Sequence, residues 1–173
     1  PETLPTDSPS SKTVSGESMR ERPAMRPGEY LEITPGLIVS QHSGEGEANQ
    51  YYLRGFNLDH GTDLAITIDG MPANMRTHGH GQGYADLHFV IPEAIQKLEV
   101  TKGPYAAEFG DFGTAGAVNL VTRKSFERSE ASIGYGSFNT FRGLLVAAPQ
   151  LDAEFQSYLV GEVYGTNGPF QSP

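Results

Sequence analysis

The chain has no cysteine and few basic residues, and both shortages limit what it can do. Without cysteine it forms no disulfide and offers no thiolate to a metal. Only 12 lysines and arginines stand against 21 aspartates and glutamates, so the formal net charge is −9 at pH 7. Because the phosphates of nucleic acids bind to basic surfaces, we expect no nucleic-acid partner. No run approaches the ~18 consecutive apolar residues of a membrane-spanning helix.

Glycine, in contrast, is abundant: 21 of the 173 residues are glycine, well above the typical share of ~7%. The densest stretch predicts a strand at residues 98–101 and a second strand at 117–122, with a break at Gly103-Pro104 between them. Further glycines follow that break. At this density, glycine provides positive φ angles or lets the backbone pack closely against another surface.

Residues 95–124 resemble the closing segment of the plug domain of TonB-dependent outer-membrane receptors, which has a Gly-Pro pair after one strand, spaced glycines and a second strand. Ala117 stands where that family often has a second glycine. Three upstream segments resemble other plug elements in the same order, at residues 32–39, 52–56 and 64–72. They contain the Pro-Gly, Arg-Gly-Phe and Ile-Asp-Gly sequences of those elements. The chain is therefore similar to this receptor family in four ordered blocks.

The resemblance implies an α+β fold, in which a small mixed β-sheet plug with short helices and long apical loops lies inside a transmembrane β-barrel. It implies a receptor of the bacterial outer membrane that imports a scarce nutrient with energy transmitted by the periplasmic protein TonB. The cargo would be a ferric siderophore, haem, a metal chelate or cobalamin, so that any bound metal, ferric chelate or haem would be present as cargo. The sequence contains neither Gly-x-Ser-x-Gly nor His-Glu-x-x-His, so we expect no enzyme.

We expect three regions along the chain. Residues 1–14, rich in proline, serine and threonine, would form a flexible arm on the periplasmic side. Residues 15–126 would form the plug, and residues 127–173 the first strands of the barrel. Within the plug, residues 28–33 and 86–95 favour short helices.

The last region shows the period-two alternation that is typical of outer-membrane barrel strands. Residues 131–148 and 154–165 are two strand-like runs, which we expect to pair as the first β-hairpin of the barrel. One hairpin is not stable alone, and a barrel that encloses a plug has about 22 strands. We therefore expect the chain to be the front of a longer protein with a monomeric barrel, truncated after its first strands.

The resemblance implies contacts with two partners, TonB and the barrel wall. Glu2, Thr3 and Leu4 match the first half of the segment that adds to TonB as a strand, but Pro5 follows and donates no main-chain hydrogen bond. Either Pro5 faces away from TonB or the true segment lies upstream. Arg54 and Lys102 would pair with carboxylates of the barrel wall. The alternative for both is an ordinary surface ion pair, worth about 0–1 kcal/mol.

Two polar loops, residues 41–50 and 74–84, would form the floor of the substrate site. Their candidate binding residues are His42, Glu45, Glu47, Asn74, Arg76, His78, His80 and Gln82. On an extended segment, His78 and His80 would point to the same side and form half of a metal site, which His42 or His60 could complete. The alternative is that these histidines only bond to loop backbone.

Two other functions stay open from the sequence. One is a soluble periplasmic or secreted module that binds metal through His78 and His80. The other is a signalling receptor of the same family, which would have an extra N-terminal domain. A soluble module would melt at a temperature that depends on metal, whereas a receptor would fractionate with the outer membrane.

Overall fold

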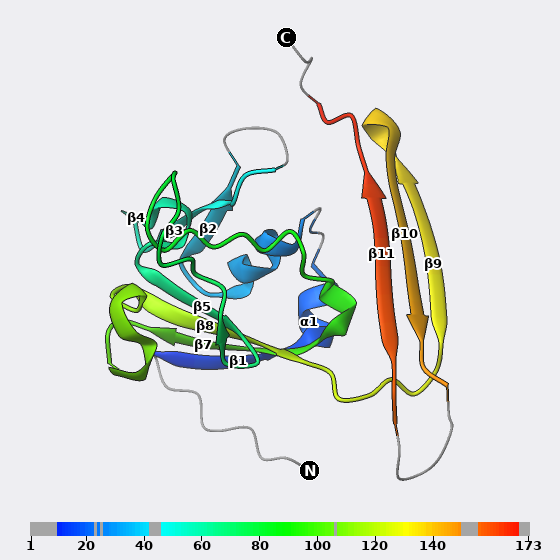
Figure 1. Ribbon diagram of the computed structural model, residues 1–173, viewed down its shortest axis with the longest axis horizontal. Coiled ribbons are helices and arrows are strands. Elements are labelled where there is room, and N and C mark those ends of the chain that lie inside the picture. Colours follow the sequence, from blue (N-terminus) through cyan, green and yellow to red (C-terminus); the bar gives the residue numbers. More distant parts are fainter. Residues whose placement is uncertain are drawn as a thin grey trace. The chain divides into compact units, whose positions relative to one another are not determined.

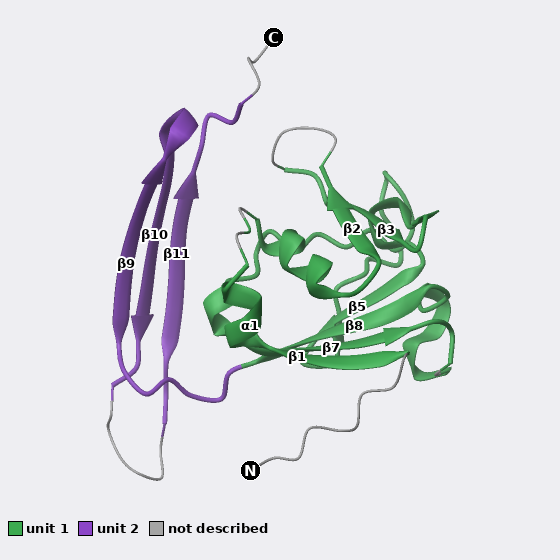
Figure 2. Cartoon of the chain, turned by 180° about the vertical axis from the view of Figure 1, so that it is seen from behind, with its two compact units in different colours: residues 1–122 green, residues 123–173 purple. Residues whose placement is uncertain are grey.

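The computed structural model describes residues 10–22, 24, 26–41, 46–105, 107–149 and 156–169. The chain divides into two compact units, Pro1–Thr122 and Arg123–Pro173, each described by itself below (Figure 2). In these described segments, every helix is too short or too polar to cross a membrane.

Unit 1 is built on a five-stranded mixed sheet in the order β1-β7-β8-β5-β6 (Figure 1). Its strands are β1 Ser11–Ser15, β5 Leu64–Ile68, β6 Met71–Pro72, β7 Ile95–Lys102 and β8 Gly116–Thr122. β5 and β8 are parallel, whereas every other neighbouring pair in this sheet is antiparallel. The mixed sheet with few short helices confirms the expected fold class.

A smaller antiparallel sheet and several short helices complete unit 1. The sheet contains β2 Leu37–Ser40, β3 Gln50–Leu53 and β4 Phe56–Asn57. The helices are α1 Gly16–Arg20 and the 3-10 turns η1 Pro27–Ile33, η2 Asp59–Gly61, η3 Pro92–Ala94 and η4 Ala107–Phe112. The helix expected at residues 28–33 is therefore present, in 3-10 form, and ends at Ile33, with Thr34 as its C-cap.

The prediction of a helix at residues 86–95 is wrong. Only η3 lies there, and β7 begins directly after it. Ile91 has extended backbone angles, φ −96° and ψ 112°. The residue before a proline is biased away from the helical region, and Pro92 lacks the N–H that a helix interior needs. Pro92 thus limits the segment to a single turn.

The arm expected at residues 1–14 contains an ordered part. β1 pairs antiparallel with β7, so that Val14 lies opposite Leu98, and the Val14 side chain is buried. This burial explains why an otherwise polar segment forms a strand. Residues 1–9, including Glu2, Thr3 and Leu4, lie outside the described residues.

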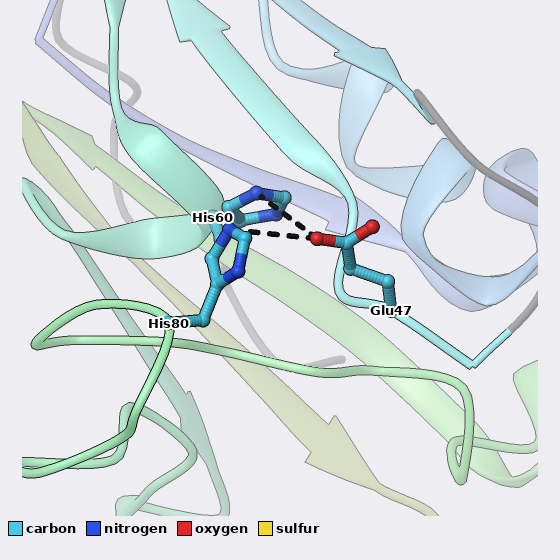
Figure 3. A group of neighbouring side chains, drawn as sticks. All are labelled: Glu47, His60 and His80. Carbon is cyan, nitrogen blue, oxygen red and sulfur yellow. Dashed lines mark ion pairs between the residues drawn. The ribbon is translucent and has the colours of Figure 1, made fainter.

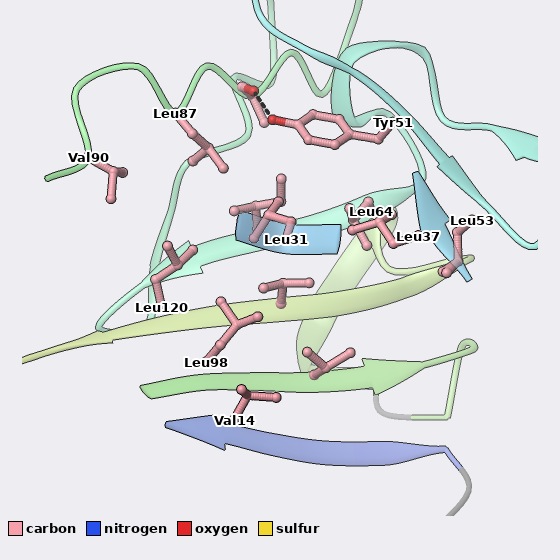
Figure 4. Packing of buried hydrophobic residues seen from close by; sticks show 14 of the residues in the cluster. Val14, Leu31, Leu37, Tyr51, Leu53, Leu64, Leu87, Val90, Leu98 and Leu120 are labelled. Atoms are coloured by element: carbon pink, nitrogen blue, oxygen red, sulfur yellow. Dashed lines mark hydrogen bonds between the residues drawn. The ribbon is translucent and has the colours of Figure 1, made fainter. Parts of the chain in front are cut away.

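The core of unit 1 follows from period-two alternation in the central strands. Leu98 of β7, Leu120 of β8 and Ile66 of β5 are buried on one face of the sheet. Tyr51 and Leu87 cover this face from the opposite side (Figure 4). The Tyr51 hydroxyl donates to the Ala85 carbonyl at 3.2 Å, and burial raises the pKa of Tyr51 well above its ordinary value.

Two local features of unit 1 show how glycine permits a tight turn and a close backbone approach. Asp69 and Gly70 have φ angles of 49° and 80° and form the two-residue turn between β5 and β6. The Asp69 carboxylate also accepts hydrogen bonds from the Thr122 amide at 2.8 Å and hydroxyl at 2.6 Å. At Gly116, a Cβ atom would lie 2.5 Å from the Thr101 carbonyl oxygen, so only glycine permits this close approach.

The other face of the sheet carries a polar ladder. Thr67 donates to the Asn119 side-chain oxygen at 2.8 Å, and the Asn119 amide donates to Glu99 at 2.9 Å. Lys97 Nζ lies 2.7 Å from Glu99 Oε1. The hydrogen bond from Lys97, and next that from Asn119, lower the pKa of Glu99. Thr67, Asn119 and Glu99 of this ladder line a groove of about 510 Å³ that contains none of the candidate binding residues.

Replacing Glu99 with glutamine is expected to flatten the acid limb of the stability curve. The pKa of Glu99 is lower in the folded protein than its ordinary value of 4.5. The stability that the ionised Glu99 contributes to the folded protein is therefore present above pH 4.5 and is lost as the pH falls through the folded pKa. We expect Glu99→Gln to lose less stability on acidification than wild type, measured by hydrogen exchange of β7 and β8. The exposed Glu21→Gln is the control, and identical acid limbs for Glu99→Gln and wild type would contradict the expectation.

Unit 2 is a three-stranded antiparallel sheet in the order β11-β10-β9. Its strands are β9 Glu130–Gly136, β10 Thr140–Ala147 and β11 Leu159–Gly165. The run 131–148, expected as one strand, is thus two strands joined by the turn η5 Ser137–Asn139. Phe138 and Asn139 adopt positive φ angles of 58° and 54°, which reverse the chain.

Candidate functional site

Three side chains from separate segments of unit 1 converge at one point (Figure 3). Glu47 precedes β3, His60 lies in η2, and His80 lies in the loop that follows β6. Glu47 Oε1 is 3.4 Å from His80 Nε2 and 3.8 Å from His60 Nε2. The two imidazole rings meet edge to face, with centroids 4.5 Å apart. We call these three residues the Glu-His-His cluster.

His60 is the rigid member of this cluster. Its side chain is 1% exposed, and its Nδ1 lies 2.7 Å from the Ala48 carbonyl oxygen. Its backbone is in the left-handed region, φ 61° and ψ 17°, which few residues other than glycine adopt. The Ala85 amide donates to the His60 carbonyl at 2.8 Å and helps to hold that conformation.

The loop that carries His80 is closed by its own backbone and by Tyr84. The Met75 amide donates to the Tyr84 carbonyl at 2.8 Å, and the Gly83 amide donates to the Met75 carbonyl at 2.7 Å. The buried Tyr84 hydroxyl accepts a hydrogen bond from the Ala48 amide at 2.6 Å. These contacts tie the 74–84 loop to the segment that presents Glu47.

The structure separates His78 from His80. The His78 ring stacks on Tyr84, with centroids 4.0 Å apart and 14° between the planes. The His80 amide donates to His78 Nδ1 at 3.2 Å. This turn differs from the extended segment that was expected from the sequence. Gly79 and Gly81 flank His80. His80 therefore joins Glu47 and His60, and His78 does not.

Asn74 is buried and bonds to backbone, which favours a positioning role over direct substrate contact. Its Oδ1 accepts from the Ile66 amide at 2.7 Å, and its Nδ2 lies 2.9–3.0 Å from the carbonyl oxygens of Gly61, Leu64 and Gly83. Arg76 and Gln82 are exposed on the same loop. His42 and Glu45 lie outside the described residues.

The two residues expected to face the barrel lie at strand ends. Arg54 is exposed in the turn between β3 and β4, with φ 52°, and its amide donates to the Gly36 carbonyl at 2.9 Å. Lys102 ends β7 and is half-buried, and its amide donates to the Ser10 carbonyl at 2.6 Å. Their pairing with barrel carboxylates stays a prediction.

Comparison with known families decides the membership of the chain. The family model described as TonB-dependent Receptor Plug Domain matches residues 5–117. This chain belongs to that family. The plug elements inferred from glycine and turn sequences lie within the matched part or directly after it, which confirms the family expected from the sequence.

Solved structures of a siderophore receptor, of FpvA bound to pyoverdines and of a copper transporter share the fold. FpvA from P. aeruginosa, bound to heterologous pyoverdines, matches with a TM-score of 0.69 and 22% identity over 94% of this chain. The copper transporter OprC matches with a TM-score of 0.67 and 24% identity over 94% of this chain. The siderophore receptor PirA from Acinetobacter baumannii matches with a TM-score of 0.62 and 21% identity over 91% of this chain. The plug chain spans only 21%, 24% and 24% of these three proteins, respectively.

Proposed function

We propose that this chain is the plug and the first barrel strands of a bacterial outer-membrane receptor that imports a metal-containing nutrient with energy from TonB. Membership in the plug family supports the general function of nutrient import. The relatives with a known cargo are a siderophore receptor, receptors for ferric siderophores and a copper transporter. Such a plug acts by binding and moving, and it needs no enzymatic step.

The observation that carries the metal-containing cargo is the chemistry of the 74–84 loop. The exposed His78, His80 and Arg76 of this loop lie with Glu47, a partly exposed carboxylate from the segment before β3. Imidazole and carboxylate suit transition metals, and a guanidinium suits the anionic groups of a chelator. Among the possible cargoes, a ferric siderophore or another metal chelate fits this set best, ahead of haem and cobalamin.

Unit 2 supports the location in the outer membrane. Ile133, Tyr135, Leu145 and Val163 are more than half exposed. The strand register places all four on one face of the sheet. An apolar face of this kind on alternating strands suits contact with lipid. It also argues against the alternative of a soluble metal-binding module. In this proposal, Arg54 and Lys102 face the barrel wall, and residues 2–4 reach TonB.

The proposal predicts that the 74–84 loop determines uptake. In a receptor-deletion strain that expresses the full natural polypeptide, the double variant His78→Ala/His80→Ala should import a labelled ferric chelate about tenfold more slowly, equivalent to losing ~1.4 kcal/mol of binding. The control is Lys12→Ala, an exposed change on a distant strand. Wild type in a strain without TonB should bind the chelate but not import it.

Two results would contradict this function. One is unchanged uptake by the double variant at wild-type receptor levels. The other is recovery of the natural polypeptide in the soluble fraction, since a receptor must sediment with outer membrane.

A further inference from the structure

We propose that the Glu-His-His cluster of the plug, Glu47, His60 and His80, binds a bare divalent transition-metal ion of the zinc or copper class. One ligand atom from each residue lies within 4.8 Å of the other two (Figure 3). Two ligand atoms on one tetrahedral metal, each at ~2.1 Å, lie ~3.4 Å apart. The 3.4 Å and 3.8 Å separations from Glu47 therefore need only small side-chain adjustments to enclose an ion.

The surroundings of His60 are those of a metal-binding histidine. Such a residue usually donates its second ring N–H to a backbone carbonyl or carboxylate, which fixes the tautomer and orients the ring. His60 Nδ1 lies 2.7 Å from the Ala48 carbonyl oxygen, which has no proton to give, so this nitrogen is the donor in that contact. In that tautomer the lone pair is on Nε2, the atom that faces Glu47.

The donor set selects the type of ion. Two imidazole nitrogens and one carboxylate oxygen suit zinc, copper and similar first-row ions. Magnesium and calcium prefer six or more oxygen ligands, which this set does not offer. Three protein ligands leave one tetrahedral position for water or for a donor atom of a bound molecule.

The cluster is both supported and accessible. His60 is 1% exposed and the Glu47 side chain 26%, whereas the His80 side chain is 44% exposed. An ion can therefore arrive from solvent at His80 and be held against the buried His60. Once bound, it would join the 74–84 loop to η2 and to the segment before β3. Ion binding would thus stiffen the loop that we propose contacts cargo.

This inference goes beyond the proposed import function and does not depend on it. A cargo chelate brings its own ligands to the metal, whereas the cluster supplies protein ligands to an ion without a chelator. Binding of the ion is measured on purified protein, so it succeeds or fails independently of uptake and of TonB.

The test is isothermal titration of the full natural polypeptide, purified in detergent without a histidine tag, with ZnCl2 and with CuCl2. We expect one ion per chain for wild type. Changing a residue that only supports a ligand typically lowers metal affinity 10–100-fold, so losing a ligand should cost at least about tenfold. His80→Ala and Glu47→Gln should show this loss. Neither change empties the core, because both side chains are partly exposed.

Thr77→Ala is the matched control, since it changes an exposed side chain of the same loop outside the cluster. Its zinc affinity should equal that of wild type, and MgCl2 should give no heat of binding with any variant. Three results would overturn the proposal. These are no zinc or copper binding by wild type at micromolar concentrations, unchanged affinity in His80→Ala, and an equal loss in Thr77→Ala and His80→Ala.

Discussion

Replacing Asn74 with alanine is expected to lower the free energy of unfolding of unit 1 by about 3 kcal/mol. The reason is that each buried polar group left without its hydrogen-bond partner costs ~1–3 kcal/mol. The Asn74 side chain is 8% exposed. It accepts from the Ile66 amide in β5 and donates to the carbonyl groups of Gly61, before β5, and of Gly83, near the end of the 74–84 loop. Without it, the loop that carries His78 and His80 loses the side-chain hydrogen bonds that join it to β5.

Hydrogen exchange of the full natural polypeptide measures this effect at the amides of β5 and of the 74–84 loop. Asn74→Asp is a sharper variant, because it keeps the acceptor but places a carboxylate against the Gly61, Leu64 and Gly83 carbonyl oxygens. We expect it to destabilise at least as much as alanine does. Thr77→Ala, an exposed change on the same loop, is the control. Protection of the loop in Asn74→Ala equal to that in Thr77→Ala would refute the role of Asn74.

Replacing Leu98 with alanine is also expected to lower the free energy of unfolding of unit 1, by about 3 kcal/mol. This value lies within the range of ~2–5 kcal/mol that is typical when a buried leucine is truncated to alanine. Leu98 is 0% exposed and lies in β7, an interior strand of the sheet. It lies opposite Val14 of β1 and Leu120 of β8, both buried. The cavity would therefore open in the middle of the sheet, where neighbouring strands leave little room for collapse.

Faster exchange of β7 and β8 amides measures this loss. Gln96→Ala, exposed in the same strand, should change stability by no more than about 0.5 kcal/mol, as is usual for surface positions. If both variants exchange at the wild-type rate, then β7 is not part of the core that holds unit 1 together. β1 should also lose protection in Leu98→Ala, since its Val14 packs in the same cluster.

Much of the fold was predictable from local sequence. The pattern at residues 98–101 and 117–122, with its break at Gly103-Pro104, predicted two strands that the structure confirms as parts of β7 and β8. Such features depend on neighbours a few positions apart, so a single sequence contains them. The prediction was wrong at residues 86–95, where a proline outweighed the helical pattern, and at 131–148. In that second segment, Phe138 and Asn139 form a turn without a marker such as Asn-Gly.

The site was less predictable. The sequence singled out the right loop, but the two histidines nearest each other in sequence belong to different contacts. His60 is 20 residues from His80 along the chain, and only the packing of η2 against Ala48 and Ala85 brings it to the cluster. Tyr84 supports both the loop and His78. The sequence indicates no such role for it, since it shows only an aromatic residue after a glycine.

The amino-acid sequence by itself determined the family, the mixed α+β class, the main strands of the plug and the glycine-dependent turns, because these follow from residue order, alternation and backbone preference. Only the tertiary structure decided that β1 joins the sheet, that β5 pairs in parallel with β8, and that Asn74 holds the 74–84 loop. It alone brought Glu47, His60 and His80 together. These features depend on which distant segments bury one another, and that choice is made by the energy of the whole packed core and not by any local pattern.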